Sequence, residues 1–123
     1  MIDHIGIQAV DMATAAAFYD AVLPTIGGGK IMDFGEAIGY GRDGKPDFWI
    51  SKATSDTLQH EAHVAFEAPD RAAVDAWFKA AVDHGAEVLH EPKVWPEYHP
   101  GYYGAFVRDP DGNNVEAVHH TFE

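Results

Sequence analysis

Apolar and polar residues alternate strictly in two short stretches of the chain. One stretch lies at residues 4–10 and the other at residues 63–69, and each is followed by apolar residues spaced three to four apart. Strict alternation is typical of a strand with one buried face, and the wider spacing is typical of a helix with one buried face. The pattern therefore predicts two strands, each leading directly into a helix.

The second strand and helix repeat the first. His4–Asp11 aligns without a gap on His63–Asp70, with large and small residues in the same order. Further along, Phe18-Tyr19 aligns on Trp77-Phe78, and we expect these four rings to lie in the core. A repeat of this length indicates a duplicated supersecondary unit.

Each predicted helix has a start signal and a stop signal. Asp11 and Asp70 are suitable N-caps, because an aspartate side chain accepts a hydrogen bond from a free N–H of the first turn. The helices are expected to run to about Leu23 and His84. A glycine, typical of a helix end, follows each of them, at Gly27 and Gly85.

Six shorter apolar runs predict the remaining strands. They lie at Lys30–Phe34, Glu36–Tyr40, Asp47–Ser51, Glu87–His90, Gly104–Arg108 and Asn114–His119. Residues 52–60 form a polar linker, 91–103 a long loop rich in proline, glycine and aromatic residues, and 109–113 a turn. The order of elements predicts an α+β fold with two tandem βαβββ modules, at about 1–52 and 61–120, in one domain spanning 1–123.

Alternation also places three ligand-type side chains on one face. In the two repeated strands and the last strand, the apolar positions pack under helices, which leaves His4, His63 and Glu116 on the opposite face. Two imidazoles and one carboxylate suit a divalent ion such as Fe, Mn, Zn or Ni and leave positions open for substrate oxygens. We therefore expect one divalent metal ion there.

Composition excludes several classes of protein. With 8 Lys and Arg against 20 Asp and Glu, the formal net charge is −12, which disfavours nucleic acid and anionic lipid as partners. There is no cysteine, so thiol chemistry and disulfides are absent. No apolar run approaches the roughly 20 residues of a membrane span. These features predict a cytoplasmic protein with a small-molecule substrate.

Three motifs in this order resemble the vicinal oxygen chelate superfamily, which includes glyoxalase I, bleomycin-resistance proteins, fosfomycin-resistance enzymes and extradiol dioxygenases. The motifs are Asp3–Ile7 followed by Ala17–Tyr19, then His63–Phe66, then Phe106–Glu116. The resemblance covers nearly the whole chain. It implies a half-open, curled mixed sheet with the helices outside, and a divalent metal in the concave cleft.

The resemblance also implies roles for residues. His4, His63 and Glu116 match the family's ligand positions on strands one, five and eight, and by analogy with glyoxalase I Glu116 could also act as the catalytic base. Glyoxalase I has a fourth, carboxylate ligand on the fourth strand, where this chain has Trp49 or Ile50. The three-ligand set is more similar to the fosfomycin-resistance and extradiol branches. Gly6 and Phe106, however, stand where those branches have a threonine and a tyrosine.

Other residues on the same face, or in the aromatic loop beside it, are candidates for substrate contact. They are Gln8, Trp49, Glu67, His99, Tyr103 and Phe106. The remaining histidines are expected on the surface, at His60, His84, His90, His119 and His120.

Two functions fit these features. The first is a metal-dependent enzyme, with lyase, isomerase or dioxygenase chemistry, that acts on a small substrate with vicinal oxygens. The second is a non-catalytic protein of the bleomycin-resistance kind that binds or sequesters a small molecule in the same cleft. Uncovered sheet edges predict a homodimer for either one.

Overall fold

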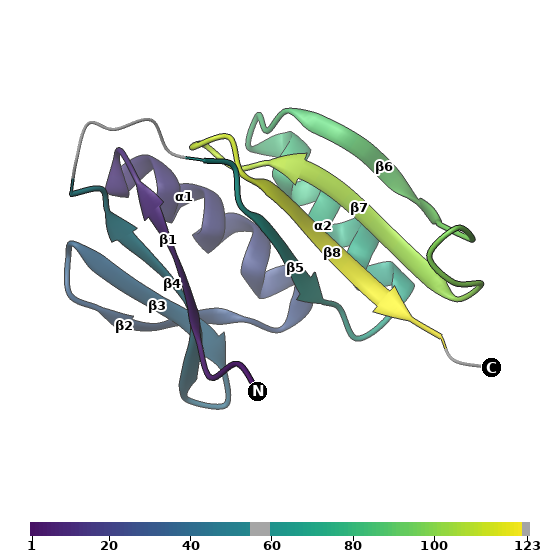
Figure 1. The fold of residues 1–123 in the computed structure, drawn as a ribbon, viewed down its shortest axis with the longest axis horizontal. Helices are drawn as coiled ribbons and strands as arrows, with labels where there is room; N and C mark the ends of the chain where they lie inside the picture. Colours follow the sequence, from purple (N-terminus) through teal and green to yellow (C-terminus); the bar gives the residue numbers. More distant parts are fainter. Residues whose placement is uncertain (55–59, 122–123) are drawn as a thin grey trace.

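The computed structural model describes residues 1–54 and 60–121. Two similar halves lie side by side, each with one sheet and one α-helix (Figure 1). The elements of the first half are β1 Ile5–Ala9, α1 Met12–Val22, the short 3-10 helix η1 Leu23–Ile26, β2 Gly29–Asp33, β3 Ala37–Arg42 and β4 Lys45–Lys52. Those of the second are β5 His63–Glu67, α2 Arg71–Asp83, β6 Val88–Val94, β7 Tyr102–Arg108 and β8 Asn114–His120.

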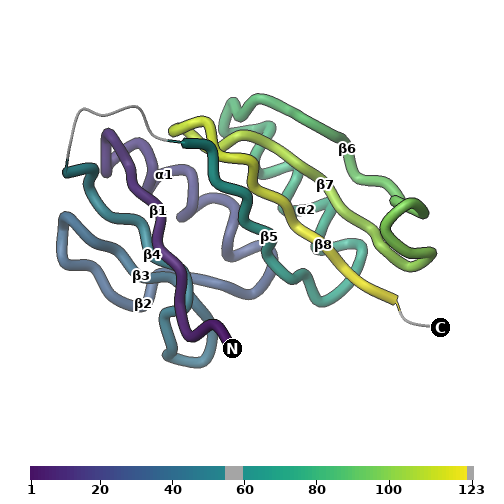
Figure 2. The backbone as a smooth tube through the Cα atoms, viewed as in Figure 1, coloured from purple at the N-terminus to yellow at the C-terminus, as the bar shows by residue number. Residues whose placement is uncertain are grey.

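The two sheets have the same strand order. It is β1-β4-β3-β2 in the first and β5-β8-β7-β6 in the second, with the first pair parallel and the other pairs antiparallel. Both sheets are open, and among the described residues no strand of one pairs with a strand of the other. The backbone passes through the first half before it enters the second (Figure 2). The prediction of two tandem βαβββ modules is confirmed.

The predicted helix caps are present. The carboxylate of Asp11 accepts the N–H of Thr14 at 3.1 Å, and that of Asp70 accepts the N–H of Ala73 at 2.7 Å. Gly27 and Gly85 have φ values of 89° and 91°, a conformation that favours glycine at helix ends.

The first helix ends close to the expected Leu23. α1 ends at Val22, and the chain continues as the 3-10 helix with Pro24 in its first turn. Because proline cannot donate an N–H, it ends the α-helical pattern there but fits the first turn of a new helical segment.

The core lies between each sheet and the helices. Phe18, Tyr19 and Trp77 are almost fully buried, as predicted, and Phe78 is half-buried against the same core. The two helices also pack against each other, so they join the halves as well as covering the sheets. Ile7 and Ala9 of β1 face this core, while Ile5 is more exposed than alternation predicts because it lies at the strand end.

The predicted long loop at residues 91–103 is shorter than expected, because strands extend into both of its ends. β6 continues to Val94 and β7 begins at Tyr102, so only the residues from Trp95 to Gly101 connect them. A proline such as Pro92 usually marks the end of a strand, but β6 is an edge strand, and an edge strand tolerates proline. The Trp95 N–H donates to the carbonyl of Tyr102 at 2.8 Å, which continues the pairing into the connection.

The predicted linker, residues 52–60, is only partly visible, since residues 55–59 lie outside the described part of the chain. Within the described part, neither helix has the length and apolar character needed to cross a lipid bilayer.

Candidate functional site

Glu116 is a buried carboxylate in the middle of the second sheet. It lies on β8, where Ala65 of β5 and Phe106 of β7 are its register partners. Alternation places its side chain on the face away from the core, as expected, yet Glu116 is only 2% exposed. Burying a carboxylate costs free energy unless hydrogen bonds replace its water, so its partners identify the candidate site.

Both oxygens of this carboxylate have a side-chain partner. His63 Nε2 lies 2.8 Å from Oε1, and the hydroxyl of Tyr102 donates to Oε2 at 2.6 Å. These three residues come from three adjacent strands, and we call them the Glu116 cluster. The His63 side chain is 49% exposed, so the buried carboxylate lies directly beneath a residue that meets solvent.

A backbone carbonyl fixes the orientation of the His63 ring. Its Nδ1 lies 3.1 Å from the carbonyl oxygen of Asn114. Because a carbonyl oxygen can only accept, Nδ1 carries a proton and donates it. Nε2 is then the atom presented to Glu116 Oε1.

Tyr102 is held in its protonated form. Burial raises the pKa of its hydroxyl, and the hydrogen bond to Glu116 and the charge of that carboxylate raise it further. The hydroxyl therefore remains a hydrogen-bond donor at neutral pH.

Gly104 leaves space for this hydrogen bond. A Cβ at this position would lie 3.3 Å from Glu116 Oε2 and 3.2 Å from Tyr102 Cε1. Both distances are tighter than ordinary contact, so a larger residue would press on both partners of the 2.6 Å hydrogen bond.

Aromatic rings surround the cluster on the side of β6. The ring of Phe106 stacks on His63 with 6.1 Å between centroids, and it also meets Trp95 and His90 edge to face. The Trp95 indole N–H donates to the carbonyl of Gly104 at 3.0 Å, and Tyr98 stacks on the same indole. The predicted site residue Phe106 thus lies next to the Glu116 cluster.

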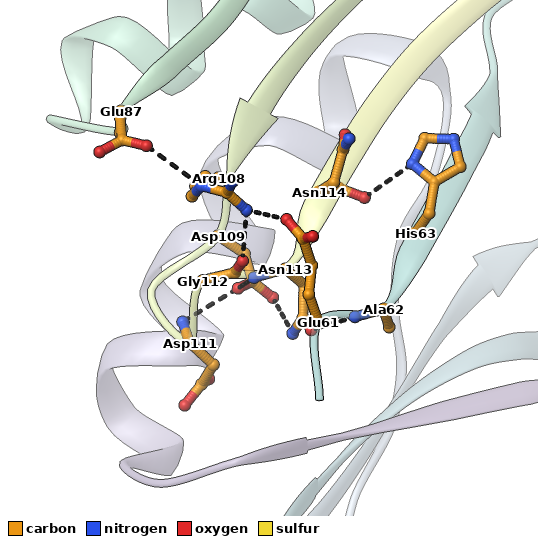
Figure 3. Close-up of polar contacts among 10 residues, drawn as sticks. All are labelled: Glu61, Ala62, His63, Glu87, Arg108, Asp109, Asp111, Gly112, Asn113 and Asn114. Carbon is orange, nitrogen blue, oxygen red and sulfur yellow. Dashed lines mark hydrogen bonds and ion pairs between the residues drawn. The ribbon is translucent and has the colours of Figure 1, made fainter. Parts of the chain in front are cut away.

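The turn between β7 and β8 holds the strand that carries His63 (Figure 3). Arg108 donates to Glu61 and Glu87, and Asn113 Oδ1 accepts the N–H of Ala62 at 2.9 Å. The expected turn at 109–113 is confirmed as a structural feature.

His4 does not join the cluster in this structure. Its Nδ1 is hydrogen-bonded to the neighbouring Asp3 at 2.8 Å, and its side chain is 61% exposed. Within residues 1–54 and 60–121, no three His, Asp or Glu side chains are close enough together to hold a metal ion. The donor chemistry of His63 and Glu116 fits a divalent metal, because Asn114 directs Nε2 toward the carboxylate. The three-residue set with His4 stays a prediction.

Tyr103 lies on the other face of the sheet. Its hydroxyl donates to Asp75 of α2 at 2.6 Å, and the guanidinium of Arg71 lies over its ring. Tyr102, which was not among the predicted site residues, takes the position beside Glu116. The sequence carried a usable signal, because Tyr102, Gly104 and Phe106 share one face by alternation.

The other candidate residues are spread over both sheets. Glu67 pairs in register with Val118 beside the cluster, while its carbonyl accepts from Arg42. Trp49 and Gln8 belong to the first sheet, where the Trp49 ring stacks on Phe34 at 6.2 Å. Substrate contact by these residues is untested.

His99 and His120 form a pair that the surface prediction did not foresee. His99 Nε2 lies 2.9 Å from His120 Nδ1, and the N–H of Gly101 donates to His99 Nδ1 at 3.1 Å. His119 is also half-buried, with Nδ1 3.1 Å from the carbonyl of Ala68. Both terminal histidines are therefore partnered rather than surface-exposed, because β8 continues to His120.

Comparisons with known proteins agree with this fold. The family model described as the Glyoxalase/Bleomycin resistance protein/Dioxygenase superfamily matches residues 1–117. No protein with a curated description matches the sequence.

Solved structures of similar fold cover almost the whole chain. A glyoxalase/bleomycin resistance protein from Albidiferax ferrireducens T118 is 26% identical, with a TM-score of 0.84 over 95% of this chain and 97% of its own. A lactoylglutathione lyase from Agrobacterium tumefaciens is 24% identical, with a TM-score of 0.69 over 97% and 92%. A glyoxalase/bleomycin resistance protein/dioxygenase family enzyme from Burkholderia phytofirmans PsJN is 21% identical, with a TM-score of 0.74 over 98% of both chains.

Proposed function

Because the chain belongs to the glyoxalase/bleomycin resistance protein/dioxygenase superfamily, we propose that it is an enzyme acting on a small molecule with two neighbouring oxygen atoms. The substrate binds beside the Glu116 cluster. One observation carries the proposal: a carboxylate that is 2% exposed is held by one histidine and one tyrosine directly beneath an exposed imidazole. Buried carboxylates with specific partners are concentrated at functional sites.

The chain's own residues supply acid–base chemistry in this proposal. Glu116 takes a proton from the carbon next to the substrate carbonyl. The electron pair of the broken C–H bond forms a carbon–carbon double bond, and the π pair of the carbonyl moves onto its oxygen. A protonated Glu116 is a weaker acceptor, so the Tyr102 hydroxyl turns to donate to that negatively charged oxygen. Phe106 and Trp95 supply apolar surface for the rest of the molecule.

A divalent metal would be held by His63, Glu116 and His4. Such an ion acts as a Lewis acid that stabilises negative charge on a substrate oxygen. The pairing of His63 with Glu116 supports this part of the proposal, and His4 would have to leave its exposed contact with Asp3. The reaction class, lyase, isomerase or dioxygenase, remains a prediction, as does a cytoplasmic location.

Proton abstraction can be measured without knowing the natural substrate. Hydroxyacetone has two neighbouring oxygens and exchangeable C–H bonds, and its deuterium uptake in D₂O is followed by proton NMR. We expect the protein, with and without added Mn(II), Ni(II) or Zn(II), to accelerate uptake, and Glu116→Gln to reduce the acceleration roughly 100-fold or more. Glu36→Gln is the matched control, because Glu36 is exposed on the first half. Equal rates in wild type and Glu116→Gln would refute the proposal.

The second candidate is a non-catalytic small-molecule binding protein. The separation of His4 from the cluster favours it, together with the packed rings of Phe106, Trp95 and Tyr98. The same experiment separates the two functions. A binder shows saturable amide shifts in β7 and β8 with no deuterium uptake above the buffer rate.

A further inference from the structure

We propose that Asn113 is a positioning residue that sets the orientation of the His63 ring. The inference rests on the proposed function for its consequence, because His63 is the exposed partner of Glu116, but its geometry is independent of any substrate. Nothing about the Asn113 side chain in the sequence suggests a role beyond completing a turn.

Asn113 and Asn114 hold the backbone of Ala62, the residue before His63. The side-chain oxygen of Asn113 accepts the N–H of Ala62 at 2.9 Å, and the N–H of Asn114 donates to the carbonyl of Ala62, also at 2.9 Å. Both backbone groups of Ala62 are therefore bound by two consecutive residues, Asn113 at the end of the β7–β8 turn and Asn114 at the start of β8; Figure 3 shows the bond from Asn113. The start of β5 has little freedom to move relative to β8.

The second step leads from Ala62 to the imidazole. The same segment, through the carbonyl of Asn114, accepts the Nδ1–H of His63 at 3.1 Å. The backbone capture and the ring contact act together, because a shift of Ala62 would move His63 away from this carbonyl. With Nδ1 held, Nε2 reaches Glu116 Oε1 at 2.8 Å.

The third step fixes Asn113 itself. Asn113 is buried, and its amide donates to Asp109 Oδ2 at 3.0 Å while its backbone N–H donates to Asp109 Oδ1 at 2.9 Å. Asp109 also accepts from the Tyr19 hydroxyl of α1 at 2.7 Å. These bonds leave the amide only one orientation, with its oxygen directed at Ala62.

Arg108 supports the same arrangement from outside the turn. Its guanidinium bridges Glu61, which precedes Ala62, and the carbonyl of Gly112, which precedes Asn113, the latter at 2.8 Å. This bridge joins the two segments at Glu61 and Gly112, the residues that precede Ala62 and Asn113. Arg108 binds the side chain of Glu61 and the carbonyl of Gly112, whereas Asn113 contacts Ala62, the residue adjacent to His63.

Asn113→Asp tests the inference with a change of few atoms. One carboxylate oxygen can still accept from the N–H of Ala62. The other oxygen takes the place of the donating NH₂ group, so it faces the negatively charged Asp109 Oδ2 without a proton between them. The repulsion should turn the side chain and release Ala62. In ¹⁵N-labelled, ligand-free protein, we expect the His63 Nδ1–H signal, assigned with His63→Gln, to be present in wild type and lost in Asn113→Asp.

Exchanging the two side chains between positions 109 and 113 separates a positioning role from simple destabilisation. In the double variant Asn113→Asp, Asp109→Asn, the amide donor and carboxylate acceptor exchange places, and the Nδ1–H signal should return. Asp111→Asn is the matched control in the same turn, because Asp111 contacts Val10 and not Ala62, and it should leave the signal unchanged.

The outcomes are distinct. Signals of His63 that stay as in wild type in Asn113→Asp, whatever its melting temperature, overturn the inference, and so does a double variant that regains stability without the Nδ1–H signal. If Asn113→Asp does not fold, Asn113→Ser, which is too short to reach Ala62, takes its place under the same criteria. A changed His63 signal with unchanged deuterium uptake by hydroxyacetone confirms the positioning and counts against the proposed function alone.

Discussion

At the scale of single residues, the site depends on one glycine that makes room for a hydrogen bond. Gly104→Ala should bring a methyl group within about 3.3 Å of Glu116 Oε2 and press on the Tyr102 ring. Overpacking of this kind costs roughly 1–3 kcal/mol. We expect a lower free energy of unfolding by urea denaturation, and a Tyr102 pKa, measured by ultraviolet absorbance against Tyr102→Phe, that moves back toward its usual value.

Gly29 offers the control for this substitution. It also lies in a strand with no positive φ, but a Cβ there would meet nothing within 4 Å. Gly29→Ala should be neutral or stabilising by up to about 1 kcal/mol, because alanine loses less backbone entropy on folding. Equal destabilisation by the two substitutions would mean that the close contact with Glu116 has no specific cost.

A second residue-scale prediction concerns Asp111 and pH. Burial raises the pKa of this carboxyl, and the charges of Asp109 and Asp11 raise it further, against the lowering effect of the hydrogen bond from the Val10 N–H. The folded protein therefore holds this proton more tightly than the unfolded chain does. The stabilisation is present below the unfolded pKa of about 3.9 and is lost as pH rises through the folded value.

Asparagine cannot ionise and can still accept from Val10. Thermal unfolding should show Asp111→Asn to be more stable than wild type at about pH 7, with the difference disappearing near pH 3. A variant that is less stable than wild type at neutral pH would contradict the predicted sign.

At the scale of helices and strands, the two N-caps can be tested separately. Asp70→Ala removes the acceptor for the N–H of Ala73 at the start of α2, which covers the sheet that carries Glu116. Losing an N-cap costs about 1 kcal/mol. The midpoint of urea unfolding should fall accordingly, while Asp70→Asn or Asp70→Ser should retain most of the stability. Loss of stability in all three variants would show that the negative charge matters more than the cap.

Elements were predictable where one local signal dominates. The aspartate caps, the glycine ends and the period-two strands are short-range features, so the sequence indicated the order of elements and the paired modules. The extent of β6 was underestimated because Pro92 is a breaker in a central strand but acceptable at an edge, and edge position is decided only by the complete sheet.

The sequence predicted which face of the sheet carries His63 and Glu116, but not that Glu116 is buried. Alternation put His63 and Glu116 on one face, as the structure has them. It could not show that Glu116 is buried, because its burial depends on Tyr102 and His63 converging from neighbouring strands. Composition indicates an aromatic loop without stating which ring faces the carboxylate, so it favours Tyr103 no more than Tyr102.

At the scale of the whole molecule, the metal prediction requires both halves. His4 belongs to the first half, and His63 and Glu116 to the second. Calorimetric titration with Mn(II), Ni(II) and Zn(II) should show one saturable site, weakened at least about tenfold in Glu116→Ala and in His4→Ala. Affinity should fall below about pH 6.5, since histidine must be neutral to coordinate.

His84→Ala is the control, because His84 lies on the surface at the end of α2. Affinity that survives in His4→Ala but not in Glu116→Ala would leave His63 and Glu116 as the only ligands. No saturable site in the wild type would refute the metal prediction.

The homodimer prediction also belongs to this scale. Each sheet is open, and exposed large apolar side chains include Ile2, Val10, Phe34 and Tyr98. Static light scattering should give twice the chain mass at micromolar concentration. A monomer mass across that range would contradict the prediction.

The hydrogen bond from Tyr19 to Asp109 has a consequence for how the duplicated halves depend on each other. It joins a helix of the first half to the turn that holds His63 in the second, and Val10 of the first half donates to Asp111 of that same turn. The turn of the second half is therefore held by groups of the first half in addition to its own side chains. Although the two copies share one topology, they are no longer self-sufficient units, and the chain should unfold as one cooperative body instead of in two stages.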